Sequence, residues 1–210
     1  MEGLKIMNKT ALVTGSNRGI GLATALTLAR EGLKVFAGMR DPQSNSKDIL
    51  SLVSDESLAV EIVELDVDNE ASVQRCFGAI ESSGEKVDVL INNASMLGPR
   101  VPIAHYPEIE WAKVFQINVI APFLLTKGLF SLLDTSEDSC VINISSSVGR
   151  KGRAYWGAYS ASKFAIEGFT QTLADETEEA KQIQIKLFKN KICFRDAKEA
   201  AEHILSLIHI

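Results

Sequence analysis

Short apolar segments alternate with longer amphipathic segments along the chain of 210 residues. The short segments are apolar throughout, which is typical of strands in a parallel sheet that has helices on both faces. We expect six such strands, at residues 10–14, 35–39, 59–67, 87–91, 140–144 and 183–188. The segments between them repeat apolar residues at helical spacing and predict helices at residues 19–30, 70–82, 107–133, 156–180 and 197–208. This alternation predicts an α/β fold, a doubly wound parallel sheet with helices on both faces, in which residues 1–210 form one domain.

The composition is that of an ordinary globular protein, with 46% hydrophobic residues, 23% charged residues and a net charge of -5. Because no basic patch accompanies this acidity, we expect no nucleic-acid partner. No apolar run approaches the ~18 residues of a membrane span, and residues 1–10 lack the apolar core of a secretory signal. The cysteines Cys76, Cys140 and Cys193 are odd in number and far apart, which argues against a disulfide framework and a zinc site. We therefore expect a soluble, cytoplasmic protein that binds no membrane.

A glycine-rich turn joins the first predicted strand to the first predicted helix. It consists of Thr14, Gly15, Ser16, Asn17, Arg18, Gly19, Ile20 and Gly21. Glycines let the backbone approach a ligand without a Cβ in the way, and a helix N-terminus offers free N–H groups and a positive dipole end. Spacing alone would also allow a plain strand-to-helix connection. Its place after the first strand, at the carboxyl edge of the sheet, favours the binding of a pyrophosphate.

A second motif places a phenol and an ammonium group on one face of a helix. Tyr159 and Lys163 are four residues apart in the helix predicted at 156–180. A neighbouring cation stabilises a phenolate and lowers its pKa from about 10, so Tyr159 could exchange a proton with an alcohol or a ketone. Taken alone, the two residues could also be a surface pair. Ser146, 13 residues before Tyr159 at the end of the fifth predicted strand, could hold a substrate oxygen near the phenol.

Together these motifs resemble the short-chain dehydrogenase/reductase family over about residues 9–177. The glycine spacing G-x-x-x-G-x-G, with Thr14 in front, resembles the family's turn. Asn92, Asn93 and Ala94 resemble its Asn-Asn-Ala-Gly element, with Ser95 in place of the glycine. The resemblance implies a Rossmann-type fold and a catalytic tetrad of Asn118, Ser146, Tyr159 and Lys163.

The resemblance also implies a role for each of these residues. The family's asparagine, here Asn118, helps to hold a water that relays protons to the lysine, and the lysine contacts the nicotinamide ribose. The choice of Ser146 over its neighbours Ser145 and Ser147 rests on the family's spacing from serine to tyrosine. The implied cofactor contacts are Gly15, Asn17, Arg18, Gly19, Ile20, Gly21, Arg40, Asp66, Val67, Asn92, Ala94, Tyr159 and Lys163. Among these, Asp66 and Val67 resemble the family's pair that contacts the adenine.

The charges near the ribose indicate which dinucleotide to expect. Asp41 lies 20 residues after Gly21, where an acid would hold the ribose 2′-hydroxyl of NAD. Asp41 is also well placed as a helix N-cap before Pro42. Arg40 directly precedes it and Arg18 lies in the glycine turn, and guanidinium groups suit the 2′-phosphate of NADP. We therefore expect NADP as the cofactor, with NAD less favoured.

The sequence departs from the family after the sixth predicted strand. The family continues with Pro-Gly, a substrate-covering loop, a helix and a seventh strand, whereas residues 189–196 contain no Pro-Gly. We expect a C-terminally shortened member in which the substrate loop is reduced and the last strand is missing. Two functions then remain. The intact tetrad favours an NADP-dependent oxidoreductase acting on a small-molecule ketone, aldehyde or secondary alcohol, and the shortened loop favours a non-catalytic NADP(H)-binding or interaction protein.

The helices around Asn118 and Tyr159 carry more apolar residues than one core face requires. The large ones are Phe115, Phe123, Phe164 and Phe169. In the family these two helices pair across a two-fold axis, so we expect a homodimer. None of the three histidines has a partner at metal-ligand spacing, and we expect no metal site.

Overall fold

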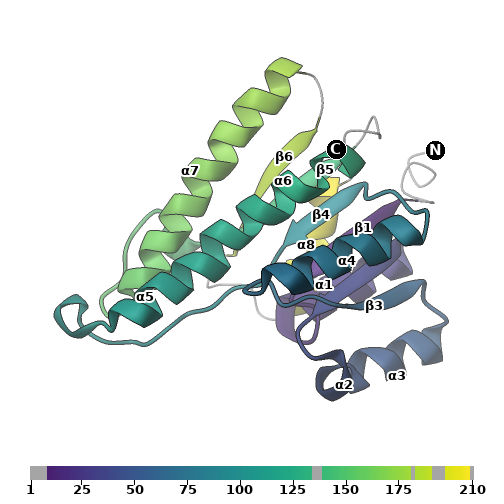
Figure 1. Cartoon of the computed structure of the whole chain (residues 1–210), viewed down its shortest axis with the longest axis horizontal. Coiled ribbons are helices and arrows are strands. Elements are labelled where there is room, and N and C mark those ends of the chain that lie inside the picture. Colours follow the sequence, from purple (N-terminus) through teal and green to yellow (C-terminus); the bar gives the residue numbers. More distant parts are fainter. Residues whose placement is uncertain (1–8, 134–138, 181–182, 191–196, 209–210) are drawn as a thin grey trace.

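Six parallel strands form the sheet of the computed structural model, which describes residues 9–133, 139–180, 183–190 and 197–208 (Figure 1). The strands are β1 (Thr10–Thr14), β2 (Lys34–Met39), β3 (Val60–Glu64), β4 (Val89–Asn92), β5 (Cys140–Ser146) and β6 (Gln184–Asn190). They lie in the order β3-β2-β1-β4-β5-β6, and each neighbouring pair is parallel. The predicted doubly wound α/β sheet is therefore confirmed. Strands β2 and β3 are added on one side of β1, and β4, β5 and β6 on the other. In such folds a ligand crevice forms at this switch point, between β1 and β4.

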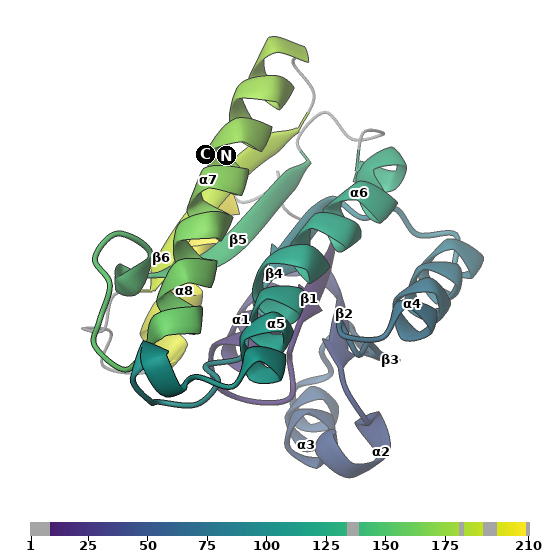
Figure 2. The ribbon, with the colours of Figure 1, turned by 60° about the vertical axis from the view of Figure 1, so that its left-hand side comes forward.

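Helices cover both faces of the sheet, as Figure 2 shows with α6 and α7 in front of it and α1 and α8 behind it. The α-helices are α1 (Gly19–Arg30), α2 (Pro42–Asn45), α3 (Lys47–Glu56), α4 (Glu70–Ser82), α5 (Glu108–Phe115), α6 (Ala121–Leu133), α7 (Gly157–Ala180) and α8 (Ala197–Ile208). Three shorter turns, η1 (Ile103–His105), η2 (Gln116–Ile120) and η3 (Ser147–Gly149), complete the described elements.

The two covered faces explain why the strands are apolar throughout. In β1, Ala11 and Val13 pack with the buried side chains of α1, α3 and α8, whereas Leu12 between them packs with those of α4 and α6. Phe36 of β2 shares the second cluster with Leu12, and both side chains are fully buried. Full burial of such a side chain contributes about 1.5–3 kcal/mol, so the sheet is a rigid base for the loops at its edge.

One predicted helix is continuous but irregular. Residues 107–133 form α5, a π-helical turn (η2) and α6, and the π turn contains Asn118. Asparagine is a poor former of regular helix, and π turns often mark functional positions. The side chain of Asn118 is turned inward and is only 2% exposed, so it does not lie on an exposed helix face.

The C-terminal helix completes one face of the sheet. In α8, Ala200 and Ile204 are fully buried in the cluster that also contains Leu28 of α1. Within the described part of the chain, β6 is the last strand of the sheet. The prediction of a reduced substrate loop concerns residues 189–196, and most of this stretch lies outside the described residues.

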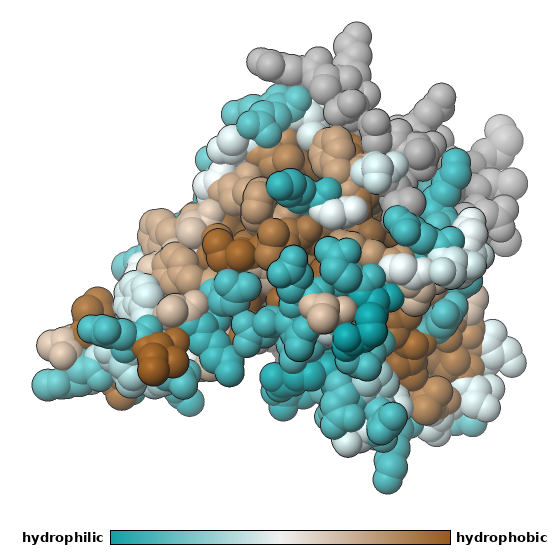
Figure 3. All heavy atoms as spheres, viewed as in Figure 1, coloured by the Kyte–Doolittle hydropathy of each residue, from teal (hydrophilic) through white to brown (hydrophobic). Residues whose placement is uncertain are grey.

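Apolar side chains are exposed along α5, α6 and α7, and brown surface gathers over these helices in Figure 3. Ile109 is 81% exposed, Phe164 47% and Phe123 42%. The helical run Glu108–Ser131 is also long and apolar enough to cross a membrane, and 39% of its most apolar window is buried. The expectation that no segment approaches a membrane span is thus wrong, because this helical run has the length and the composition of one. Core helices pass the same test, and the absence of membrane binding stays a prediction.

Candidate active site

The glycine turn brings the start of α1 close to the end of β1. Gly15 and Gly19 have positive φ angles of 69° and 57°, a conformation that favours glycine. A Cβ on Gly21 would lie 2.2 Å from the carbonyl oxygen of Gly15 and 2.4 Å from Nδ2 of Asn93. Around Gly19, nothing lies within 4 Å of such a Cβ. The first turn of α1 is therefore packed tightly on one side and open on the other, as a phosphate site at a helix N-terminus requires.

Two polar side chains lock this turn to the segment after β4. The Thr14 hydroxyl oxygen accepts hydrogen bonds from the backbone N–H of Asn93 at 3.0 Å and of Ala94 at 2.9 Å. The Asn93 side chain donates from Nδ2 to the carbonyl oxygens of Thr14 at 2.8 Å and Gly15 at 3.2 Å. The resemblance emphasised Asn92, but Asn93 makes the direct contact with the glycine turn.

A cavity of about 750 Å³ lies beside this turn, within the range of about 300–1,000 Å³ that is common for ligand pockets. Every predicted cofactor contact except Asn92 lines it: Gly15, Asn17, Arg18, Gly19, Ile20, Gly21, Arg40, Asp66, Val67, Ala94, Tyr159 and Lys163. The remaining lining residues include Asn45, Asn93, Ser95, Met96, Lys113 and Ser145. Asn92 is buried instead, and its Nδ2 donates to Oδ1 of Asn143 at 2.8 Å, so it supports the sheet behind the cavity.

Two exposed guanidinium groups reach the cavity from different elements. Arg18 comes from the glycine turn and Arg40 follows β2. Asp41 is not among the lining residues. It is the N-cap residue of α2, directly before Pro42 in the first turn, as predicted, with a φ of 50°. Its side chain makes no cap hydrogen bond, and its carbonyl oxygen accepts from the side chain of Asn45. The cavity thus meets two arginines and not the Asp41 carboxylate, a charge pattern that suits a 2′-phosphate.

Tyr159 lies on α7 and lines the cavity, with Ser95 after β4 on the same cavity and Ser146 at the end of β5. Burial raises the pKa of the phenol above its ordinary value, and the side chains of Ser146 and Ser95, which lower this pKa, offset the effect only in part. The expected lowering of the tyrosine pKa is therefore wrong in this structure, because desolvation of the phenolate is the larger effect.

Lys163 lies one helical turn after Tyr159 and is only 3% exposed. Its Nζ donates to the carbonyl oxygen of Ile144 at 2.8 Å and lies 5.4 Å from the centre of the Tyr159 ring. Burial lowers the pKa of the ammonium group to about 8, so it is still mainly protonated at neutral pH. The structure therefore places a buried cation beside the phenol, on the helix face that the motif predicts.

Asn118 joins the segment after β4 to α7. Its Oδ1 accepts from the backbone N–H of Met96 at 2.7 Å, and its Nδ2 donates to the carbonyl oxygen of Met96 at 2.9 Å and to the hydroxyl of Ser162 at 3.0 Å. The Ser162 hydroxyl in turn donates to the carbonyl oxygen of Tyr159 at 2.8 Å. This is a structural clamp around the site, and the role of Asn118 in a water relay stays a prediction.

Glu167 is a site residue that the sequence reasoning missed. It lies on α7 one turn beyond Lys163, and its side chain is only 6% exposed. Its carboxylate accepts from the hydroxyl of Ser145 at 2.9 Å and from Nε of Arg150 at 3.2 Å. These two partners flank Ser146 in the sequence, so the carboxylate ties both sides of Ser146 to α7. The helical spacing of four residues from Lys163 was the signal that could have indicated it.

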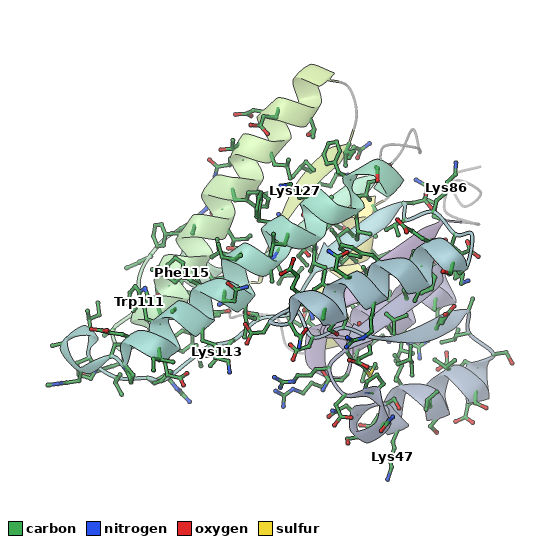
Figure 4. All side chains as sticks on the ribbon, viewed as in Figure 1. Lys47, Lys86, Trp111, Lys113, Phe115 and Lys127 are labelled. Carbon is green, nitrogen blue, oxygen red and sulfur yellow. The ribbon has the colours of Figure 1, made fainter. Side chains whose placement is uncertain are left out.

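Lys113 is a second residue that was missed. Figure 4 shows it on the other side of α5 from Trp111 and Phe115, whose rings stack at 5.9 Å. Lys113 lines the cavity and adds a fourth cation to Arg18, Arg40 and Lys163. A lysine on an exposed helix face normally indicates only a solvated surface, so the sequence carried no signal for this position.

Comparison with known proteins agrees with this geometry. A family model described as short chain dehydrogenase matches residues 9–193, and the chain therefore belongs to the short-chain dehydrogenase family. The uncharacterized oxidoreductase YciK of Escherichia coli strain K12 is 37% identical over 175 residues, which are 82% of this chain and 69% of that protein. Eight curated relatives, 30% to 37% identical to this chain, are all longer, and the chain covers 65% to 69% of their lengths.

Solved structures of relatives contain nicotinamide dinucleotides. A short chain dehydrogenase from Escherichia coli CFT073, complexed with NADPH, is 32% identical and superposes with a TM-score of 0.85, over 97% of this chain and 90% of that one. A metagenomic short-chain oxidoreductase in complex with NADP is 25% identical, with a TM-score of 0.89 over 98% of this chain and 93% of that one.

Proposed function

We propose that this protein is an NADP(H)-dependent oxidoreductase that interconverts a small ketone or aldehyde and the corresponding alcohol. One observation carries the proposal: Tyr159 and Lys163 line the same cavity as the glycine turn, so a proton-exchanging phenol faces a dinucleotide-sized site. The two relatives whose structures contain NADP or NADPH support the choice of cofactor.

The residues of the cavity fit the parts of NADP(H). The backbone around Gly19, open on the cavity side, would hold the pyrophosphate at the N-terminus of α1. Arg18 and Arg40 would hold the 2′-phosphate, and Asp66 and Val67 would lie at the adenine. When bound, the nicotinamide supplies the hydride for a reduction or accepts it in an oxidation.

Tyr159 carries out the proton transfer. In the direction of reduction, its hydroxyl gives a proton to the substrate oxygen as that oxygen becomes an alcohol, and the phenol becomes a phenolate. Ser146, whose side chain lowers the pKa of the same phenol, orients the substrate oxygen toward it. The buried ammonium of Lys163 stabilises the phenolate, because its positive charge lies beside the ring in a poorly solvated region.

The test is the loss of NADPH absorbance with a panel of ketones and aldehydes, measured beside a binding titration of NADPH. We expect turnover of at least one carbonyl compound. Tyr159→Phe removes the transferable proton and keeps the ring, so turnover should fall ~10²–10⁴-fold while NADPH affinity is retained. Full turnover in the phenylalanine variant would contradict the mechanism. Binding of NADPH without turnover of any carbonyl compound would support the alternative, a non-catalytic nucleotide-binding protein.

We further propose that two copies of the chain pair through α5, α6 and α7. The exposed apolar residues Ile109, Phe123 and Phe164 support this pairing, because exposed apolar surface of this kind commonly marks an interface. Light scattering at micromolar concentration should give the mass of a dimer, and a monomeric mass would contradict the proposal.

We also propose a cytoplasmic location. Cys76 and Cys140 are free and buried, and burial raises the pKa of their thiols to about 12 and about 11, so both thiols stay protonated and unreactive. Free thiols suit a reducing compartment. Fractionation of cells that express the protein tests the location, and recovery in a secreted or membrane fraction would contradict it.

A further inference from the structure

The loop that joins β5 to α7 carries an excess of positive charge beside the active site. Residues 139–174 contain four basic residues and one acidic residue, Glu167, although the whole chain has a net charge of -5. Three of the basic residues, Arg150, Lys151 and Arg153, lie in this loop. Arg150 is paired with Glu167 at 3.2 Å. Among the residues that the structure describes, neither Lys151 nor the side chain of Arg153 has an acidic or hydrogen-bonding partner.

A tight turn holds Arg153 over an aromatic ring. The backbone N–H of Trp156 donates to the carbonyl oxygen of Arg153 at 3.1 Å, and the N–H of Arg153 donates to the hydroxyl of Ser160 on α7 at 3.5 Å. Tyr155 in this turn has a φ of 69°, a value that glycine usually supplies at the third position of a type II turn. The guanidinium carbon of Arg153 lies over the indole of Trp156, 4.7 Å from the ring centre. The exposed cation therefore has a defined position that it owes to an aromatic ring and to the turn.

The same indole ring links this cation to the reacting group. The ring centres of Trp156 and Tyr159 lie 5.8 Å apart with an angle of 73° between the planes, which is an edge-to-face contact. One indole ring thus separates the guanidinium group of Arg153 from the phenol ring. Among the described residues that line the dinucleotide cavity, neither Arg153 nor Trp156 occurs. Their position suits the part of a substrate that extends beyond the reacting carbonyl group and outside the cofactor site.

We propose that Arg153 binds a carboxylate group of the substrate, so that the enzyme acts on oxo acids. A guanidinium group offers two parallel N–H donors that match the two oxygens of a carboxylate, and one cation matches its single charge. Because an indole ring lies between the cation and the phenol, the carbonyl carbon and the carboxylate of the substrate have to be separated by several carbon atoms. The positive loop also attracts such an anion to a chain that is negative overall. This inference rests on the proposed function, since it names the substrate class of the same site.

The first test compares 4-oxopentanoate, 5-oxohexanoate and 6-oxoheptanoate with their methyl esters, which keep the carbonyl group and remove the charge. With NADPH, kcat/KM of the wild type should be at least ~tenfold higher for the best of these acids than for its ester. Arg153→Met keeps an unbranched side chain to cover Trp156, and it should remove this preference by lowering kcat/KM for the acid and leaving the value for the ester nearly unchanged. The matched control is Lys151→Met, which removes an exposed cation of the same loop and should retain the preference.

The second test measures binding and needs no turnover. The chain has two tryptophans, so the fluorescence of Trp111→Phe comes from Trp156 alone, and a carboxylate bound to the cation over this ring should change it. The protein is loaded with oxidised NADP, which has no hydride to transfer, and is then titrated with the same acids and esters. The best acid should give a saturable change that its ester does not give and that Arg153→Met abolishes.

The outcomes separate this proposal from the proposed function. No saturable change with any of the three acids would overturn the proposal, even if the enzyme reduces neutral carbonyl compounds. Equal kcat/KM for acids and esters, or an equal loss of preference in Lys151→Met, would also overturn it. Saturable binding of an acid that depends on Arg153, in a protein that reduces no carbonyl compound, would support the carboxylate site and refute the proposed function.

Discussion

Replacement of Glu167 by alanine should destabilise the protein and loosen the loop that carries Ser146. The buried carboxylate accepts from the hydroxyl of Ser145 at 2.9 Å and from Nε of Arg150 at 3.2 Å. A hydrogen bond to a charged group contributes about 1.5–3 kcal/mol, and alanine would leave the buried Ser145 hydroxyl without this acceptor. The guanidinium side of the pair is 64% exposed, so solvent screening limits that contact to ~1 kcal/mol or less.

We therefore expect Glu167→Ala to lower the free energy of unfolding by ~2–4 kcal/mol, measured by urea denaturation without nucleotide. Arg150→Ala should lower the free energy of unfolding by less than ~1 kcal/mol, because it removes only the contact that solvent screens. Glu167→Gln keeps an acceptor for Ser145 and should fall between these two. Turnover should drop in Glu167→Ala more than NADPH affinity does, because Ser146 is displaced and the glycine turn is not.

The matched control is Glu176→Gln, which changes an exposed glutamate on the same helix and should leave both stability and turnover unchanged. The reasoning would be refuted if Glu167→Ala unfolds at the same urea concentration as the wild type. It would also be refuted if Arg150→Ala costs as much as Glu167→Ala, because the stabilisation would then come from the exposed ion pair.

Three further predictions concern the cavity. Gly21→Ala should lower the free energy of unfolding by more than ~2 kcal/mol and weaken NADPH binding, because its Cβ would lie 2.2 Å from a backbone oxygen. In Gly19→Ala the Cβ meets no neighbour, so the free energy of unfolding should fall only by the ~1–2 kcal/mol that a positive φ costs. Equal thermal unfolding of the two variants would contradict this expectation. Arg40→Ala should weaken the affinity for NADPH at least ~tenfold in a binding titration and leave the affinity for NADH nearly unchanged. Equal losses of affinity for the two dinucleotides would show that Arg40 does not contact the 2′-phosphate. The pKa of Lys163 is lowered to about 8, so the folded protein releases this proton before the unfolded chain does, and stability should rise between about pH 8 and 10.5 by up to ~3 kcal/mol. Lys163→Met should lose that rise relative to wild type in urea denaturation across this range, and identical pH dependence of the two proteins would contradict the assignment.

The sequence alone determined the element order and most of the residues that line the cavity. Strands that are apolar throughout require a sheet covered on both faces, and the turn at Gly15–Gly21 lies where β1 ends and α1 begins. Because such a turn is formed by consecutive residues, local sequence was sufficient to locate it. The spacing of Tyr159 and Lys163 likewise places both side chains on one helix face in any regular helix.

Tertiary structure decided what depends on contacts between distant segments. The sequence could not show that Asn93 rather than Asn92 contacts the glycine turn, because adjacent residues at a strand end point to opposite sides. It also could not show that Ser95 and Tyr159, 64 residues apart in the chain, line the same cavity.

The same limit applies to charge and burial. The cation of Lys163 was expected to dominate the pKa of Tyr159. The packing of α7 against β5 buries Lys163 and partly buries Tyr159, and the cost of desolvating a phenolate exceeds the benefit of its partners. Local spacing determines which residues can meet. The depth at which the whole fold buries them decides how they titrate, because solvation depends on every segment packed around the site.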